Sequence, residues 1–385
     1  MSSTLKKKVV IAIPVLFVGG TEIQTLNLVK VLKSGGYQVS ICCYYEYDNS
    51  MVEEIQATGV EVTLMKLKRS DGLISLLMKL RTLMKRLSPD IAHIQYIAPG
   101  LIPSIAARLA GVRTVFATVH QPGRVYGLKE KLLLRTAAGF CTAFFCVSRS
   151  VEETWFGDSE VFDPDNITAG RRHFTIYNAV DAGRIENIVK ATNKEELRKS
   201  LGVNGKKIVG VVGRLRWEKG QSILLKAMQA IVQSAPDTVL IVVGDGPDRE
   251  ALRKQAAVLK ILDNIIWLGQ KNPEEVYQLY SIMDVLAVPS LFEGFGFAAA
   301  EAMAAGIPVV GTRIDGLTEV VDDGVTGILV PPNDSPALAH AILEFVGDPT
   351  RAESAGVRGK ERAISLFSVE RFRTSILASY KQFVL

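Results

Sequence analysis

The sequence is poor in cysteine and in aromatic residues. Of its 385 residues, four are cysteine and 7% are aromatic. Cys42 and Cys43 are adjacent, and neither they nor Cys141 and Cys146 have the spacing of metal ligands. We therefore expect small buried thiols in a reducing cytosol, with no disulfide framework and no metal site built on cysteine.

Long apolar runs are also missing. No stretch approaches the ~18 apolar residues that a membrane-spanning helix needs. Residues 1–8 are polar and basic, with no long apolar segment behind them, which predicts no secretory signal and a cytoplasmic protein. The first strand-to-helix turn lacks the three-glycine fingerprint of dinucleotide-binding proteins, which argues against an oxidoreductase.

The chain is long enough for two domains, and 48% of it is hydrophobic. Buried strands appear as short aliphatic runs, such as Val9–Ile13, Val239–Val243 and Val285–Val288, which are typical of parallel sheets. Strand and helix patterns alternate in both halves, which predicts an α/β fold. We expect domains over residues 1–178 and 179–366 and a terminal helix over residues 367–385.

Two carboxylates flank the start of a helix in the second half. The stretch Glu293-Gly-Phe-Gly-Phe-Ala-Ala-Ala-Glu301 lies between two aliphatic strands, so its loop should sit at the carboxyl edge of a parallel sheet. Amides at a helix start can face an anion or sugar hydroxyls. Glu301 lies about two turns into the helix, roughly 10 Å beyond Glu293 along its axis. The two acids are thus expected to hold two ends of one elongated ligand. A helix-dipole acid and a solvated glutamate would give the same pattern.

Two cations share a loop after an earlier strand. Arg214 and Lys219 lie in the run Gly213-Arg-Leu-Arg-Trp-Glu-Lys-Gly220, which follows Lys207–Val212. Arginine bonds phosphate in bidentate fashion and lysine acts as a point charge, which suits a leaving diphosphate. Ordinary solvated charges on a loop are the simpler interpretation. Both this loop and the loop with Glu293 lie in the same half of the chain, which favours a shared ligand site over two unrelated charged loops.

Together these motifs resemble the retaining nucleotide-sugar glycosyltransferases of the GT-B fold, family 4. The resemblance covers roughly residues 205–335 and is thinner in the first half, where it rests on Gly19-Gly20-Thr21-Glu22, His120 and Ile176–Asp181. Tyr177 and Ala179 stand where the family usually has proline and often has glycine. Further matching segments are Val242–Pro247, Pro289-Ser290, Ile314–Val321 and Gly324–Pro331.

The resemblance implies two Rossmann-like, doubly wound parallel-sheet domains that face a central cleft, with a C-terminal helix crossing back to the first. It implies a UDP- or GDP-sugar donor on the second domain, an acceptor on the first, and no required metal cofactor. Arg214 and Lys219 would hold the diphosphate, Glu301 the ribose, and Glu293 and His120 the sugar. Backbone support for the donor would come from Gly19, Gly20, Gly213, Phe295, Gly296 and Phe297.

Three alternatives stay open at this stage. A GT-B sugar-nucleotide epimerase would share the architecture, but it needs general acid–base carboxylates rather than a paired-cation loop. A non-catalytic sugar-binding protein would be signalled by loss of the cations or of the two glutamates, all of which are present. Asp163-Pro-Asp165 resembles the metal-binding acid pair of the other major glycosyltransferase fold, but no strand precedes it, which favours a surface loop.

Positive charge is concentrated at the start of the chain. Residues 1–135 hold 18 lysines and arginines against 9 acids, a net of +9, whereas the whole chain carries +5. Much of the excess lies in residues 66–87, where leucines from Leu73 to Leu87 recur at helical spacing beside Lys79, Arg81, Lys85 and Arg86. Such a helix packs on a sheet or lies on an anionic membrane. We expect peripheral contact with the cytoplasmic membrane face, a lipid-linked or envelope glycan acceptor, and no nucleic-acid partner.

Overall fold

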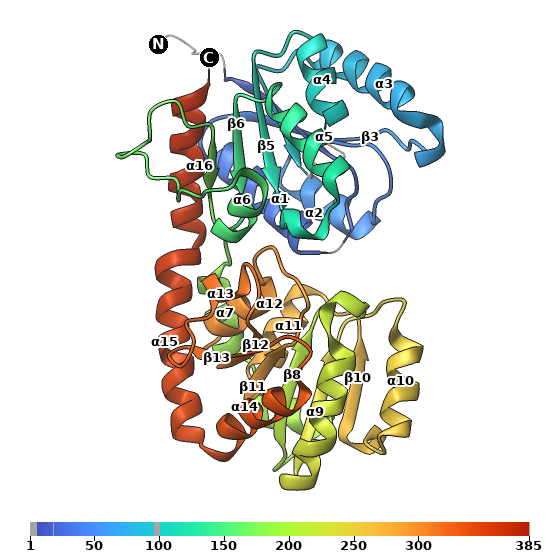
Figure 1. Cartoon of the computed structure of the whole chain (residues 1–385), viewed down its shortest axis with the longest axis vertical. Coiled ribbons are helices and arrows are strands. Elements are labelled where there is room, and N and C mark those ends of the chain that lie inside the picture. The colour runs from blue at the N-terminus through green and yellow to red at the C-terminus, as the bar shows by residue number, and fades with distance from the viewer. Residues whose placement is uncertain (1–5, 18, 96–100, 385) are drawn as a thin grey trace. The chain divides into compact units, whose positions relative to one another are not determined.

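The computed structural model describes residues 6–17, 19–95 and 101–384, and within it the chain divides into two compact units (Figure 1). Unit 1 comprises Met1–Ala179 and Glu370–Leu385, and unit 2 comprises Val180–Val369. Residues 1–5 of the segment expected to lack a secretory signal lie outside the described residues. No helix among the described residues is long and apolar enough to cross a membrane.

Unit 1 is built on a seven-stranded parallel sheet of order β3-β2-β1-β4-β5-β6-β7. Its strands are β1 (Lys8–Ile13), β2 (Gln38–Cys43), β3 (Glu61–Leu64), β4 (Ile91–Gln95), β5 (Thr114–Val119), β6 (Ala143–Cys146) and β7 (His173–Thr175). Its helices are α1 (Gly20–Ser34), α2 (Asn49–Ala57), α3 (Gly72–Leu87), α4 (Leu101–Leu109), α5 (Leu128–Ala138), α6 (Arg149–Phe156) and nearly all of α16 (Val369–Phe383).

Unit 2 is built on a six-stranded parallel sheet of order β10-β9-β8-β11-β12-β13. Its strands are β8 (Lys207–Val212), β9 (Thr238–Val243), β10 (Ile265–Gly269), β11 (Val285–Val288), β12 (Val309–Thr312) and β13 (Gly327–Val330). Its helices are α7 (Ala182–Ala191), α8 (Lys194–Ser200), α9 (Gln221–Ser234), α10 (Arg249–Val258), α11 (Pro273–Tyr280), α12 (Phe297–Ala304), α13 (Leu317–Val320), α14 (Ser335–Gly347) and α15 (Pro349–Phe367).

Both sheets confirm the α/β, Rossmann-like architecture expected from the aliphatic runs. In each, the strand order reverses direction beside the first strand of the unit, and at such a switch point the loops at the carboxyl edge part to admit a ligand. The four cysteines are buried free thiols, as expected. Residues 157–172 contain neither helix nor regular strand, which agrees with the surface loop predicted around Asp163.

The C-terminal helix α16 packs on the rest of unit 1 through an apolar stripe. Phe372, Ile376 and Tyr380 are buried, and the Tyr380 ring meets the Tyr37 ring edge-on at 5.5 Å between centroids. Leu377 lies so close to Gly35 that an added Cβ there would stand 2.4 Å from Cδ2. Residues more than 300 positions apart in sequence therefore pack against one another.

Helix α3 buries Leu76, Leu80, Leu83 and Met84, so the simpler of its two interpretations, packing in unit 1, is confirmed for this face. The expected stripe was wrong at its start, because Leu73 is 59% exposed. The cations also differ from one another. The Arg81 Nε donates to the Leu109 carbonyl on α4 at 3.2 Å, whereas the others, Lys79, Lys85 and Arg86, are exposed.

Candidate functional site

The loop Gly213–Gly220, here called the cation loop, joins β8 to α9. Gly213 and Gly220 both have positive φ angles, +143° and +68°, which residues with a Cβ rarely adopt. Leu215 is buried and fixes the middle of the loop, while Arg214 is exposed. Residues 217–219 form one turn of 3-10 helix that ends in Gly220. The loop is thus held at both ends and in its centre, with its cations toward solvent.

Close backbone contacts fix three loops of this sheet edge against one another. A Cβ on Gly220 would lie 1.9 Å from the Pro289 carbonyl oxygen. One on Gly244 would lie 2.0 Å from the Gly213 oxygen, and one on Gly246 would lie 2.3 Å from the Leu215 oxygen. Glycine at these positions is therefore a packing requirement, and it explains the glycine pattern of the two motifs.

The loop Pro289–Gly296, here called the carboxylate loop, brings Glu293 to Lys219. The Lys219 Nζ lies 2.6 Å from Glu293 Oε1, and the two side chains are 32% and 14% exposed. Ser290 Oγ donates to the same carboxylate oxygen at 2.9 Å. The Leu291 amide donates to the Glu218 carbonyl at 2.8 Å, which ties the loop backbones together. Two residues 74 positions apart, singled out from sequence, thus form a direct ion pair.

Helix α12 starts at this same point without a side-chain cap. Gly296 is its N-cap residue, with φ of +100°, and Phe297 is its first helical residue. The Phe295 ring is 2% exposed and packs on the rings of Phe297 and Phe367, at 5.4 and 5.2 Å between centroids. The Phe295 side chain is therefore a core element, so only its backbone is available for binding. Amides of an uncapped helix start favour an anionic or hydroxyl-bearing ligand.

Glu301 lies in a different environment from Glu293. It is 9% exposed, and its Oε2 accepts a hydrogen bond from the Tyr280 hydroxyl at 3.1 Å. Burial raises the pKa of Glu301 to about 7, although hydrogen bonds from Tyr280 and Tyr277 favour the carboxylate. The same burial and the Glu301 charge raise the pKa of both tyrosines. Glu301 is therefore poised between protonated and ionised forms near neutral pH.

Unit 1 holds the remaining candidates. Gly19 is extended and is the N-cap residue of α1, which begins at Gly20. A Cβ on Gly19 would lie 2.8 Å from the Glu22 carboxylate, which folds back over the turn. His120 follows β5, is 7% exposed, and its Nε2 lies 2.6 Å from Gln95 Oε1. Burial lowers the pKa of His120 to about 3, so the imidazole is neutral at physiological pH.

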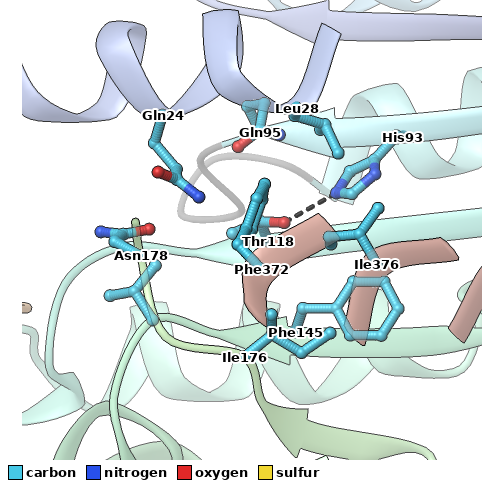
Figure 2. A pocket seen from close by; sticks show the side chains of 11 residues that line it. Gln24, Leu28, His93, Gln95, Thr118, Phe145, Ile176, Asn178, Phe372 and Ile376 are labelled. Carbon is cyan, nitrogen blue, oxygen red and sulfur yellow. Dashed lines mark hydrogen bonds between the residues drawn. The ribbon is translucent and has the colours of Figure 1, made fainter. Parts of the chain in front are cut away.

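His93 has a structural role. Its Nδ1 lies 2.6 Å from the Tyr380 hydroxyl and its Nε2 lies 2.7 Å from Thr118 Oγ1. Beside it is a cavity of about 20 Å³, which admits about one water molecule (Figure 2). The Gln24 side chain lines this cavity, and its Nε2 has no hydrogen-bond partner among the described residues. The cavity is lined mainly by apolar side chains, but the Gln24 amide and the neighbouring Asn178 give a bound water polar partners.

One cluster in unit 1 has metal-like composition. Glu152, Asp158 and His173 place potential ligand atoms within 4.8 Å of one another. Arg171 Nη2 already bonds Glu152 Oε1 at 2.8 Å and Asp158 Oδ1 at 2.9 Å. The guanidinium supplies the positive charge that a metal would bring, so we interpret the cluster as an ion-pair network.

Sequence reasoning missed several supporting residues. Tyr280 and Gln95 lie far in sequence from the residues that they contact, and an aromatic or amide residue on its own carries no signal of such a role. Ser290 could have been found from its place next to the carboxylate loop motif, since a hydroxyl three residues before Glu293 can reach it.

Comparisons with known proteins give one consistent result. Residues 193–362 match the family model described as glycosyl transferases group 1, and residues 18–184 match the model described as Glycosyltransferase Family 4. The chain is 30% identical over 281 residues to the GDP-mannose-dependent alpha-(1-6)-phosphatidylinositol monomannoside mannosyltransferase of Mycolicibacterium smegmatis, which covers 69% of this chain and 70% of that protein.

A second relative aligns over less of its length. The lipopolysaccharide core biosynthesis mannosyltransferase LpsB of Rhizobium meliloti is 32% identical over 197 residues, 49% of this chain and 56% of that protein. Among solved structures, Anabaena HepE in complex with UDP-glucose superposes with a TM-score of 0.83 at 21% identity, covering 97% of this chain and 99% of that one. This last similarity concerns the fold.

The buried Glu301 makes stability depend on pH in a defined direction. Because its pKa is raised to about 7 in the folded protein, the stabilising effect of the protonated form is complete below pH 4.5 and is lost as pH rises toward 7. The Glu301→Gln variant has no ionisable group at this position, so its free energy of unfolding does not show this loss. Relative to wild type, it should gain about 3 kcal/mol of unfolding free energy between pH 5 and pH 8. Urea unfolding at both pH values measures this, with the exposed Glu195→Gln as control. Parallel pH profiles for wild type and Glu301→Gln would contradict it.

Proposed function

Since the chain belongs to glycosyltransferase family 4, we propose that it transfers a hexose from a UDP- or GDP-sugar to a hydroxyl of a lipid-linked or envelope glycan. The family is one of retaining enzymes that use nucleotide-sugar donors, and this chain is such an enzyme. One observation carries the assignment of the site, namely the contact between Lys219 of the cation loop and Glu293 of the carboxylate loop.

Arg214 and Lys219 neutralise the leaving diphosphate in this proposal. As the bond between the anomeric carbon and the phosphate oxygen breaks, negative charge develops on the β-phosphate, and a fixed cation there lowers the barrier. Lys219 lies beside Glu293, and Arg214 is exposed at the same sheet edge. With these two charges in place, the enzyme needs no metal cofactor.

In this proposal the two glutamates bind different parts of the donor. Glu301 accepts hydrogen bonds from the ribose hydroxyls, which favours its carboxylate form. Glu293 bonds the transferred sugar, and the Phe295, Gly296 and Phe297 amides support the sugar and phosphate. The support for this division is the separation of the sites, since Glu293 pairs with Lys219 whereas Glu301 lies against Tyr280 of α11.

The candidates of unit 1 have proposed donor contacts of their own. Gly19 and Gly20 open α1 with backbone that can approach the β-phosphate, and Gly213 gives the cation loop the same freedom. His120 orients the sugar as a neutral imidazole, which its lowered pKa supports. These residues lie at the carboxyl edge of their sheets, after β1, β8 and β5 respectively.

The relatives support the choice of donor and acceptor classes. The mycobacterial relative is named for GDP-mannose and for a phosphatidylinositol monomannoside, and LpsB for the lipopolysaccharide core. The Anabaena structure holds UDP-glucose. We extend both base types and a lipid-linked or envelope acceptor to this chain. Thermal-shift measurements against UDP-, GDP- and ADP-sugars would identify the base, because a tight ligand raises the unfolding midpoint.

An exposed face of unit 1 suits an anionic membrane. Helix α3 packs against α4 and α4 against α5, so these helices form one layer. Ile74 and Met78 of α3 are 79% and 52% exposed, and Leu128 and Leu132 of α5 are 87% and 68% exposed. Apolar side chains beside cations are typical of helices that lie in the membrane interface. We propose peripheral binding at the cytoplasmic membrane face. The exposed cations of this face include Lys79, Lys85, Arg86, Lys129 and Arg135.

Loss of either cation should stop turnover without unfolding the protein. Lys219→Ala and Arg214→Ala should each lower kcat by ~100-fold or more with saturating donor, since a charged donor aimed at developing charge contributes on the order of 3 kcal/mol. Steady-state kinetics measure this, with the exposed Arg216→Ala on the same loop as control. Near-wild-type kcat in either variant would refute the assignment. Reversible loss of wild-type activity in excess EDTA would refute the metal-free proposal.

The two glutamate variants should differ in their affinity for the nucleoside diphosphate, measured by calorimetry. Glu301→Gln should weaken binding of the free nucleoside diphosphate and of the intact donor alike, because both carry the ribose. Glu293→Gln should leave diphosphate affinity nearly unchanged and reduce transfer by roughly 10- to 100-fold, through loss of a charge-assisted hydrogen bond. Equal losses of diphosphate affinity in the two variants would show that the roles are assigned wrongly.

Neutralising the exposed cations of α3 should weaken membrane binding only. Lys79→Gln, Lys85→Gln and Arg86→Gln together should lower binding to anionic vesicles, with each cation contributing roughly 1 kcal/mol and salt screening the effect. Arg81 is left in place because it holds the Leu109 carbonyl. A matched triple variant of exposed unit 2 lysines, Lys194, Lys254 and Lys260, should bind vesicles like wild type. If wild-type protein does not sediment with anionic vesicles at low salt, α3 has only its packing role.

A further inference from the structure

Two neighbouring strands of unit 1 carry a row of polar side chains on one face. His93 and Gln95 lie two residues apart on β4, and Thr118 near the end of β5 lies two residues before His120, which follows the strand. Parallel pairing places Gln95 directly opposite Thr118. Because strand side chains two residues apart share a face, His93, Gln95 and Thr118 lie on the face that α16 covers through Tyr380, and the contact with Gln95 brings His120 to the same face. Figure 2 shows three of them, His93, Gln95 and Thr118, around the cavity.

The row forms two separate histidine contacts. The two ring nitrogens of His93 are in hydrogen-bond contact with the hydroxyls of Tyr380 and Thr118. Gln95 holds His120, the ring at the carboxyl edge, at 2.6 Å between Oε1 and Nε2. Gln95 is 2% exposed, so its amide does not exchange this contact for bulk water. Only the second contact involves a residue with a proposed substrate role.

The Gln95 contact determines which imidazole nitrogen carries the proton. A carboxamide oxygen accepts hydrogen bonds, so the His120 nitrogen facing it must be the protonated one, and in a neutral ring the other nitrogen is then an acceptor. This tautomer follows from the hydrogen-bond network. The lowered pKa of His120 agrees with a neutral ring. The Nδ1 atom is therefore a hydrogen-bond acceptor.

We propose that Gln95 is a positioning residue, which holds His120 in the Nε2-protonated form so that Nδ1 accepts a hydrogen bond from a hydroxyl of the transferred sugar. The inference rests on the proposed role of His120 and deepens it. It assigns His120 the role of an acceptor for a sugar hydroxyl and excludes it as a proton donor through Nδ1. It also makes a residue without substrate contact part of the support of the site.

Kinetics of four variants test the proposal. Gln95→Met keeps the side-chain volume but removes the acceptor, and it should lower kcat about tenfold while leaving the Kd of the nucleoside diphosphate unchanged. Thr118→Val is the matched control, since it removes the corresponding bond to His93, and it should keep wild-type kcat. His120→Ala should lower kcat at least as far as Gln95→Met. The double variant Gln95→Met, His120→Ala should be no slower than His120→Ala alone.

The outcomes separate this inference from the function on which it rests. Wild-type kcat in His120→Ala would overturn the role of His120 itself. If His120→Ala lowers kcat while Gln95→Met keeps the wild-type kcat, the role of Gln95 is overturned. The same holds if the double variant loses kcat by the product of the two single losses. Nitrogen-15 NMR of the wild-type imidazoles provides a test that does not depend on any variant folding. Its expected result is His120 protonated at Nε2, and protonation at Nδ1 would overturn the proposal.

Discussion

The candidate site of unit 2 depends on backbone packing that leaves no room for side chains. Gly220 presses on the Pro289 carbonyl, and Gly244 presses on the Gly213 carbonyl, at distances that any Cβ would violate. Because the loops touch through their backbones, Lys219 reaches Glu293 and forms a short ion pair. A side chain at either glycine would push the loops apart and separate that pair. Close packing is therefore the condition for the preorganised charge that the proposed mechanism assigns to phosphate departure.

Burial sets the ionisation of the groups that do not form such a pair. Removal from water disfavours the charged form of any group, so the same physical cause raises the pKa of Glu301 and lowers those of His120 and His93. The consequences differ with the chemistry. In the proposed mechanism, Glu301 gains its charge when the ribose hydroxyls donate to it, which would couple its ionisation to ribose binding. His120 stays neutral, and the proposal gives it a hydrogen-bonding role whose direction is set by the Gln95 contact.

Local periodicity predicted the elements well and their surroundings less well. The aliphatic runs Val9–Ile13, Val239–Val243 and Val285–Val288 lie in buried strands. Leu73 was assigned to the buried stripe of α3 but is exposed, because periodicity shows which side chains share a face and not how far the neighbouring element extends along it. Arg81 was grouped with the solvated cations but bonds a carbonyl of α4, a contact that helical spacing alone cannot reveal.

The sequence by itself determined the α/β class, the order of the motifs and the residue types at the two sheet edges, because these follow from hydrophobic pattern and from glycine and charge positions along the chain. Tertiary structure decided the partners. Parallel register set Gln95 beside the end of β5, and the packing of α11 and α12 on α7 accompanies the contact between Tyr280 and Glu301. Such contacts join residues that are distant in sequence, and their strength depends on burial, which only the folded chain creates.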